Sequence, residues 1–296
     1  MYNGYLGKIC NNFALHQTKT NCAMKNLFLS FICSFFIMFL TSCGSSGTQE
    51  EETTDSQTTE APVAEASSVT LSPAPGAVDF PDAILEMNAP SEGAKVNGNT
   101  VSFEYEVTNY ELGVQTTDAD QKTLANSGKG QHIHLILNNN PYYAIYEPTY
   151  EQELEDGHYV ALSFLSRSYH QSVKQPEAFK VSQFTVGNAS AEPVDLSQPM
   201  LFYSRPKGTY SGEGTQKVLF DFYLVNTVVG ANGNQVKVTV NGDTEFMVDE
   251  WAPMVLEGLP MGENTVKIEL IDADGNLVDS PFNSETRTFT LEETAS

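Results

Sequence analysis

The sequence predicts an all-β protein with two tandem antiparallel β-sandwiches, immunoglobulin-like or fibronectin-like, after a disordered N-terminal segment. Three observations predict this fold. Short segments rich in Val, Ile, Phe and Tyr alternate apolar and polar side chains, which is the period of a strand. Asn-Gly and Asp-Gly dipeptides of the kind found in hairpin turns separate them. The third observation is an internal repeat of about a hundred residues without helical periodicity.

The repeat is clearest in one strand-like segment. Residues 101–109 read VSFEYEVTN and residues 218–226 read VLFDFYLVN, with the same alternation. Similarity of this kind along two stretches of one chain is typical of a duplicated domain. We therefore expect a first domain, a linker and a second domain at 81–187, 188–197 and 198–293.

The N-terminal part carries targeting features. Residues 24–42 begin with Met-Lys-Asn and continue as an apolar run that is too short to span a bilayer but suits a signal-peptide core. Residues 40–43 read LTSC and resemble the lipobox of bacterial lipoproteins. The resemblance implies that 24–42 is cleaved and that Cys43 is lipidated. Residues 1–23 lack signal-peptide features, so we expect them to be an upstream extension before an initiator at Met24. A secretory signal with a chance cysteine is the alternative.

Residues 43–80 are mostly Ser, Thr, Glu, Ala and Pro. Such a segment buries too little apolar surface to offset the entropy of ordering, so we expect a disordered acidic tether. Glycine follows Cys43 and acidic residues come soon after, which resembles outer-membrane lipoproteins of Gram-negative bacteria. We expect a lipid-anchored protein at the outer membrane or cell surface, with a periplasm-facing orientation as the alternative.

The net charge of the chain excludes one class of binding partner. It carries 15 basic and 38 acidic side chains, for a net charge of -23. This charge repels the phosphate backbone, so we expect no nucleic-acid partner. Three of the four cysteines precede Cys43, and a processed chain would therefore contain no disulfide.

Two histidines, His132 and His134, lie two positions apart in a strand-like segment. The residues that alternate with these histidines along the strand align with apolar residues of the second repeat and should face the core of the sandwich. Because successive side chains of a strand point to opposite faces, both imidazoles should face away from that core. They align with Gln235 and Lys237, and we expect them to be exposed to solvent. Two such residues lie about 7 Å apart at their Cα atoms, close enough to bind one metal ion.

His158 and His170 stand at either end of the next strand-like segment. One hypothesis is a Cu(II) or Zn(II) site on His132 and His134 with His158 or His170 as third ligand. His158 shares its strand phase with Val160, Leu162 and Phe164, which we expect to face the core. It could therefore join the site only through a bulge in the strand or from a position at its rim. Alternatively, these histidines are ordinary solvated or strand-end residues.

An insertion precedes the histidine segment. The first copy has 24 positions from Asn109 to Ile133, whereas the second has 10 from Asn226 to Val236, so the first carries 14 more. Long loops on rigid scaffolds commonly bear binding groups. Asp118 and Asp120 lie in this loop and could complete a metal site.

A second hypothesis is a surface module for a glycan or an anionic ligand. Hydroxyls and cations gather between 166 and 174, a combination suited to phosphate or carboxylate. Aromatic rings could stack on sugars, although tyrosines also pack between sheets. The candidates are Arg167, Ser168, Lys174, Tyr142 and Tyr143.

We expect a protein that is not an enzyme, because Ser168 near His170 has no acid placed to orient the imidazole. A purely structural or adhesive envelope lipoprotein is a further alternative.

Residues 130–146 and 157–174 resemble a domain of unassigned function in exported bacterial proteins. The shared marks are a histidine-rich strand ending in a polar turn, a Gly-His pair that opens a strand, and a further histidine. The resemblance is confined to these two segments of the chain. It implies export and a histidine-lined surface.

Overall fold

The computed structural model describes residues 68–293 except Ala191. All of these residues lie within one compact unit. They form β strands joined by loops and three short 3-10 helices, which confirms the predicted all-β class. Among the described residues, no helix is long and apolar enough to cross a membrane. The signal peptide, Cys43 and the tether up to residue 67 lie outside them, so those predictions stay untested.

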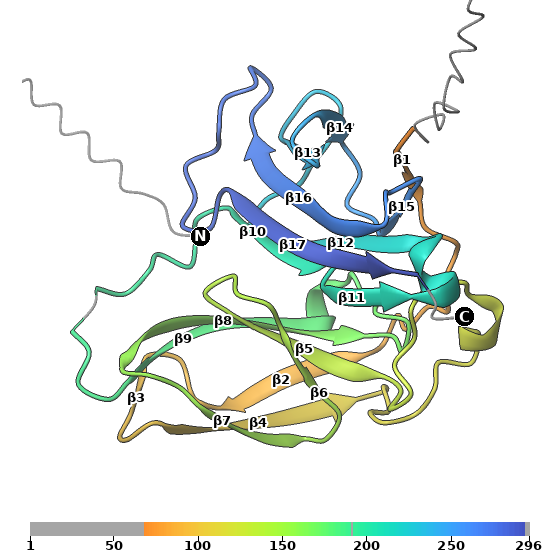
Figure 1. The fold of residues 1–296 in the computed structure, drawn as a ribbon. Coiled ribbons are helices and arrows are strands. Elements are labelled where there is room, and N and C mark those ends of the chain that lie inside the picture. The colour runs from red at the N-terminus through yellow and green to blue at the C-terminus, as the bar shows by residue number, and fades with distance from the viewer. Residues whose placement is uncertain (1–67, 191, 294–296) are drawn as a thin grey trace, which may run out of the picture. The chain divides into compact units, whose positions relative to one another are not determined.

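The first sandwich pairs a three-stranded sheet with a five-stranded sheet (Figure 1). The smaller sheet has the order β2 (Ile84–Ala89), β4 (Thr100–Thr108), β7 (Thr149–Glu153). The larger has the order β3 (Ala94–Val96), β9 (Phe179–Val186), β8 (Gly157–Ser166), β5 (His132–Leu137), β6 (Tyr143–Ile145). The connections contain the 3-10 helices η1 (Ala119–Gln121) and η2 (Pro176–Ala178).

The second sandwich repeats this topology. Its five-stranded sheet has the order β11 (Gly208–Ser211), β17 (Glu285–Glu292), β16 (Gly262–Ile271), β13 (Gln235–Val240), β14 (Thr244–Val248). In both copies the first strand of this order pairs in parallel with the second, and all other pairs are antiparallel. The other sheet contains β10 (Met200–Arg205), β12 (Val218–Val225) and β15 (Met254–Glu257), with η3 (Gly212–Thr215) after β11. The repeat seen in the sequence is thus a repeated strand order.

A strand from before the first sandwich completes the second. β1 (Thr70–Pro73) pairs antiparallel with β15. The prediction that the disordered tether extends to residue 80 is therefore wrong for this stretch. Adding a strand to a sheet edge depends on main-chain hydrogen bonds, which the composition of the added segment does not reveal.

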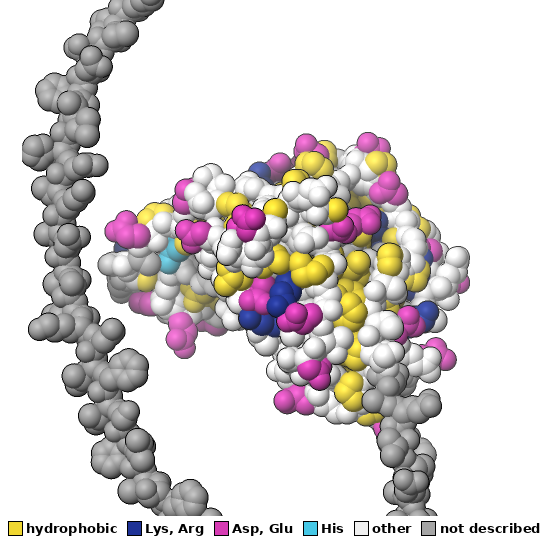
Figure 2. All heavy atoms as spheres, turned by 90° about the horizontal axis from the view of Figure 1, so that it is seen from above, with side chains coloured by type: hydrophobic (Ala, Val, Ile, Leu, Met, Phe, Trp, Pro, Cys, Tyr) yellow, Lys and Arg dark blue, Asp and Glu magenta, His cyan; other side chains and the backbone are white. Residues whose placement is uncertain are grey.

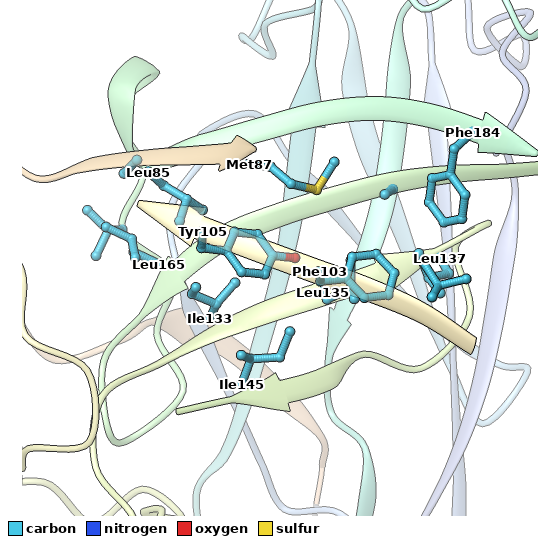
Figure 3. Close-up of a cluster of buried hydrophobic side chains, with 14 of the residues drawn as sticks. Leu85, Met87, Phe103, Tyr105, Ile133, Leu135, Leu137, Ile145, Leu165 and Phe184 are labelled. Carbon is cyan, nitrogen blue, oxygen red and sulfur yellow. The ribbon is translucent and has the colours of Figure 1, made fainter. Parts of the chain in front are cut away.

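Alternating side chains of both sheets fill the core of the first sandwich (Figure 3). The ring of Phe103 meets that of Phe184 edge-on, with centroids 5.8 Å apart. The Tyr105 hydroxyl is 2.9 Å from Ser163 Oγ and so satisfies its polar group inside the core. Ile133, Leu135 and Leu137 of β5 point into this core, as the alternation predicted, and are labelled in Figure 3.

The opposite face of β5 and β8 is covered by the second sandwich. A separate apolar cluster joins Ile136, Val160, Leu162 and Phe164 to residues of β10 and β12, and Phe164 stacks on Tyr223 at 4.6 Å between centroids. The expectation that Val160, Leu162 and Phe164 face the sandwich core is therefore wrong. Their neighbours Ala161 and Leu165 do so instead. Because both faces of β8 are buried, its apolar run does not show which face is which.

Polar contacts also join the two sandwiches. Lys174 Nζ lies 2.7 Å from Asp221 Oδ1, and the Ser172 amide donates to Asp221 Oδ2 at 2.9 Å. Asn139, at the turn between β5 and β6, accepts from the Tyr203 amide at 2.8 Å and donates to the Leu201 carbonyl at 3.2 Å. The second sandwich is therefore packed directly on the first.

Candidate metal centre

Strand β5 presents His132 and His134 side by side on the face that meets the second sandwich. Both side chains are 0 % exposed. The prediction that they face away from the core of their own sandwich agrees with this arrangement, but the prediction that they are exposed to solvent is wrong. The strand period assigns residues to two opposite faces and does not say what covers the second face.

A tight turn after β8 brings in His170. The His170 amide donates to the Arg167 carbonyl at 2.9 Å, and the Arg167 amide donates to the Gln171 carbonyl at 3.0 Å. His170 has φ +69°, in the left-handed region that few residues other than glycine adopt. Strand β5 and this turn together place three imidazoles against one another.

The ring nitrogens converge on one point. His132 Nε2 lies 2.9 Å from His134 Nε2 and 3.2 Å from His170 Nδ1. All three nitrogens lie within 4.8 Å of one another. Ligands on bonds of about 2.0–2.1 Å in tetrahedral geometry are roughly 3.3 Å apart, so small ring rotations would let all three bind one ion.

Hydrogen bonds orient the first two rings. His132 Nδ1 is 2.8 Å from the Gly130 carbonyl, which only accepts, so Nδ1 carries the proton and Nε2 keeps its lone pair. His134 Nδ1 is 3.3 Å from Ser204 Oγ of β10. A hydroxyl can accept or donate, so this ring can likewise direct an unprotonated Nε2 towards the cluster.

Burial keeps the cluster neutral. It lowers the pKa of His132 to about 4, and the charges of Arg205 and Lys207 act in the same direction. Burial foremost also holds the pKa values of His134 and His170 well below the usual range for histidine. At neutral pH the three rings are uncharged, which is the form that binds metals.

The fourth histidine lies elsewhere. His158 is on the same face of β8 as Phe164, which pairs with His134, but six residues away and therefore about 20 Å along the strand. Its ring contacts Thr185 Oγ1 at 3.2 Å and Gln183 Oε1 at 2.9 Å. The alternative of His158 as third ligand is wrong, because it stands too far along the strand.

The insertion loop supplies no ligand. Asp118 contacts Lys122 Nζ at 2.9 Å and accepts from the Tyr169 hydroxyl at 3.0 Å. In the described part of the chain, the only group that could hold a metal contains the three histidines and no carboxylate. The prediction that Asp118 or Asp120 completes the site is therefore wrong.

The residues proposed for an anion are engaged by the protein itself. Arg167 donates to the carbonyls of Val78 and Ser172. Ser168 exchanges hydrogen bonds with Thr116, and Lys174 is paired with Asp221 as described above. These contacts hold loops in place, and a ligand role for the three residues stays a prediction.

The tyrosines proposed as stacking platforms are also engaged. Tyr142 is 4 % exposed, and its ring stacks on His134 with centroids 3.5 Å apart. Tyr143 is half-buried and packs against the core of the first sandwich. Tyr142 therefore offers no free face to a sugar.

Sequence reasoning missed the contribution of the second sandwich. Ser204 contacts His134, and Arg205 and Lys207 line a cavity of about 510 Å³ together with His170. Two cations within three positions in an acidic chain are a signal of the same kind as the one noted between 166 and 174. Nothing in the sequence pairs β10 with β5, however.

No protein-family model and no curated protein matches this chain. Among solved structures it is similar to fibronectin(III)-like modules of Clostridium thermocellum CbhA, at 11% identity and TM-score 0.26, over 71% of this chain and 95% of that one. It is also similar to Bacteroides ovatus SGBP-B of a mixed-linkage glucan utilization locus, in complex with a mixed-linkage heptasaccharide. That match has 9% identity and TM-score 0.21, over 71% of this chain and 70% of the other. Similarities this low indicate neither a family nor a function for this chain.

Proposed function

We propose that this chain is a lipid-anchored cell-envelope protein that binds one Zn(II) or Cu(II) ion through His132, His134 and His170. The observation that carries the proposal is the convergence of three ring nitrogens within 4.8 Å. Chance pairs of histidines on a strand are common, but a third imidazole delivered by a separate turn points to a shared ligand.

The donor set suits these two metals. Imidazole nitrogen is a preferred ligand of zinc and copper, and a site of three histidines leaves one coordination position open for water or another ligand. On chemical grounds Cu(II) should bind more tightly than Zn(II). We propose binding and not catalysis, because in the described residues no carboxylate joins the cluster to act as a general base.

Isothermal titration of the purified protein with Zn(II) and with Cu(II) tests the proposal. We expect one ion per chain, and at least a hundredfold loss of affinity in His132→Ala, His134→Ala and His170→Ala. His158→Ala is the matched control, because it removes a half-buried histidine of the same sandwich that lies outside the cluster. Affinity that is the same in all four variants would overturn the proposal.

The lipid anchor is tested separately. The LTSC motif at 40–43 supports acylation of Cys43. We expect the protein to partition into the detergent phase of a Triton X-114 extract and Cys43→Ser to move to the aqueous phase. Equal partitioning of the two proteins would contradict lipidation at this cysteine.

A further inference from the structure

A polar cavity of about 510 Å³ lies beside the histidine cluster. Its walls come from residues 122–126 of the insertion loop, from His170, and from the β10–β11 region of the second sandwich, including Arg205, Lys207 and Glu213. The volume is in the range of small-molecule sites. His170 belongs both to this wall and to the cluster.

Arg205 is buried without a counter-charge. It is 8 % exposed, its Nη1 donates to the Tyr210 hydroxyl at 3.0 Å, and its Nε has no hydrogen-bond partner. None of the ion pairs among the described residues includes Arg205. Burying a guanidinium group without an anion is costly, so such a residue is normally paired.

Lys207 stands next to Arg205, is half-buried and also lacks a counter-charge. Its Nζ lies 4.0 Å from the centre of the Tyr142 ring and donates to the Tyr142 carbonyl, and it forms no ion pair within residues 68–293. Burial, with the charge of Arg205, lowers the pKa of Lys207 to about 8. Glu213 lines the cavity but lies beyond ion-pair distance of both cations.

The rest of the molecule makes this pair of cations unusual. The chain has a net charge of -23, and Asp and Glu are scattered over the face shown in Figure 2. In such a protein most cations have acidic neighbours available to them. One buried and one half-buried cation without a carboxylate partner create a local positive potential beside the cavity, which attracts an anion.

We propose that this cavity binds the oxyanion group of a small molecule, a carboxylate or a phosphate, between Arg205 and Lys207. The guanidinium of Arg205 lines the cavity and offers the planar set of donors that both oxyanions accept, and within the protein its Nε has no hydrogen-bond partner. The site does not depend on a bound metal. If a metal is bound, the oxyanion lies beside it, because His170 belongs both to the cluster and to the cavity wall. The negative charge of the oxyanion then offsets the two positive charges of the ion, so metal and oxyanion should each bind more tightly in the presence of the other.

Calorimetric titration of the metal-free, EDTA-treated protein with inorganic phosphate and with acetate tests the proposal. We expect saturable binding of at least one of them, and at least a tenfold loss of affinity in Arg205→Met and in Lys207→Met. Lys95→Met is the matched control, because Lys95 is an exposed cation on β3 of the first sandwich, outside the cavity wall. Lys95→Met should bind like the unchanged protein, which would show that the loss is not a general effect of net charge.

The phosphate and acetate titrations show whether the cavity prefers a phosphate or a carboxylate, and saturable binding of either anion supports the site. Lys207→Met keeps the test decisive if Arg205→Met fails to fold, because Lys207 lies at the more open edge of the wall. The proposal is overturned if neither oxyanion binds, with or without metal, or if Lys207→Met binds as tightly as the unchanged protein. It is also overturned if phosphate binds only after metal loading, because the phosphate would then be bound to the metal ion. A protein that binds phosphate and no metal would refute the metal centre and leave this site standing.

Discussion

At the scale of single residues, the candidate centre depends on how its rings are held. Gly130 provides the carbonyl that orients His132, and it has φ +89°. A Cβ atom built on Gly130 would lie 2.3 Å from the Val114 carbonyl oxygen. Only glycine therefore fits where the insertion loop enters β5, and the orientation of the first ligand depends on it.

Gly130→Ala should therefore destabilise the protein and weaken metal binding together. A left-handed backbone costs an alanine about 1–2 kcal/mol, and the backbone clash adds about 1–3 kcal/mol. Urea unfolding and a zinc titration measure both effects. Gly98→Ala is the control, because Gly98 has φ +83° with nothing within 4 Å of the added Cβ. If the two variants lose equal stability, the contact with Val114 is unimportant.

Ser204 is the second residue whose role can be isolated. It is the partner of His134 Nδ1 across the interface. Residues that orient a metal-bound histidine typically change metal affinity by about 10–100-fold, so we expect a loss in this range for Ser204→Ala. Ser182→Ala removes another buried hydroxyl, one without a hydrogen-bond partner, and should leave zinc affinity unchanged. Identical zinc affinities in both variants would show that Ser204 does not orient the ring.

At the scale of elements, the segment after β8 carries both His170 and Lys174, so it connects the cluster to the interface. Lys174 pairs with Asp221, whose side chain is fully buried. Removing one partner of a buried pair leaves the other charge without compensation.

We expect Asp221→Asn to lower the free energy of unfolding by about 3–5 kcal/mol. Glu86→Gln breaks the Lys180–Glu86 pair, in which both side chains are nearly half exposed, and should cost at most about 1 kcal/mol. Guanidinium unfolding of both variants compares the two pairs directly. A small loss in Asp221→Asn would mean that the Lys174 ammonium finds water or another partner.

Strand β1 makes a different connection, because it joins a segment before the first sandwich to a sheet of the second. Leu71→Pro should disrupt its pairing with β15, since proline has no backbone N–H and fits poorly within a ladder. By hydrogen exchange we expect roughly tenfold faster exchange in Met254–Glu257 and no change in Thr100–Thr108 of β4. Unchanged exchange in β15 would mean that β1 adds nothing to this edge.

At the scale of the whole molecule, the fold could be predicted because it follows from local patterns. The two-residue period gave the strands, and the repeat of 101–109 at 218–226 gave two sandwiches with one strand order. The internal face of β5 was also predictable. What covers its other face was not, because packing of β10 on β5 and β8 joins segments that no periodicity relates.

The site was predictable in part for the same reason. His132 and His134 are neighbours by strand geometry alone, so the sequence could pair them. The choice of His170 over His158 depends on a five-residue turn and on distance along β8, neither of which the spacing of histidines specifies. Ser204, Arg205 and Lys207 belong to the second sandwich, and no pattern in the sequence places that sandwich beside β5.

The most direct test of the metal centre is the ligand count of the bound ion. X-ray absorption at the zinc edge, on protein loaded with one equivalent of Zn(II), should show three imidazole nitrogens at roughly 2.0–2.1 Å. The signal should fall to fewer imidazoles in His170→Ala and stay at three in His158→Ala. A shell made of oxygen ligands alone, or a spectrum unchanged in His170→Ala, would contradict the assignment of the ion to His132, His134 and His170.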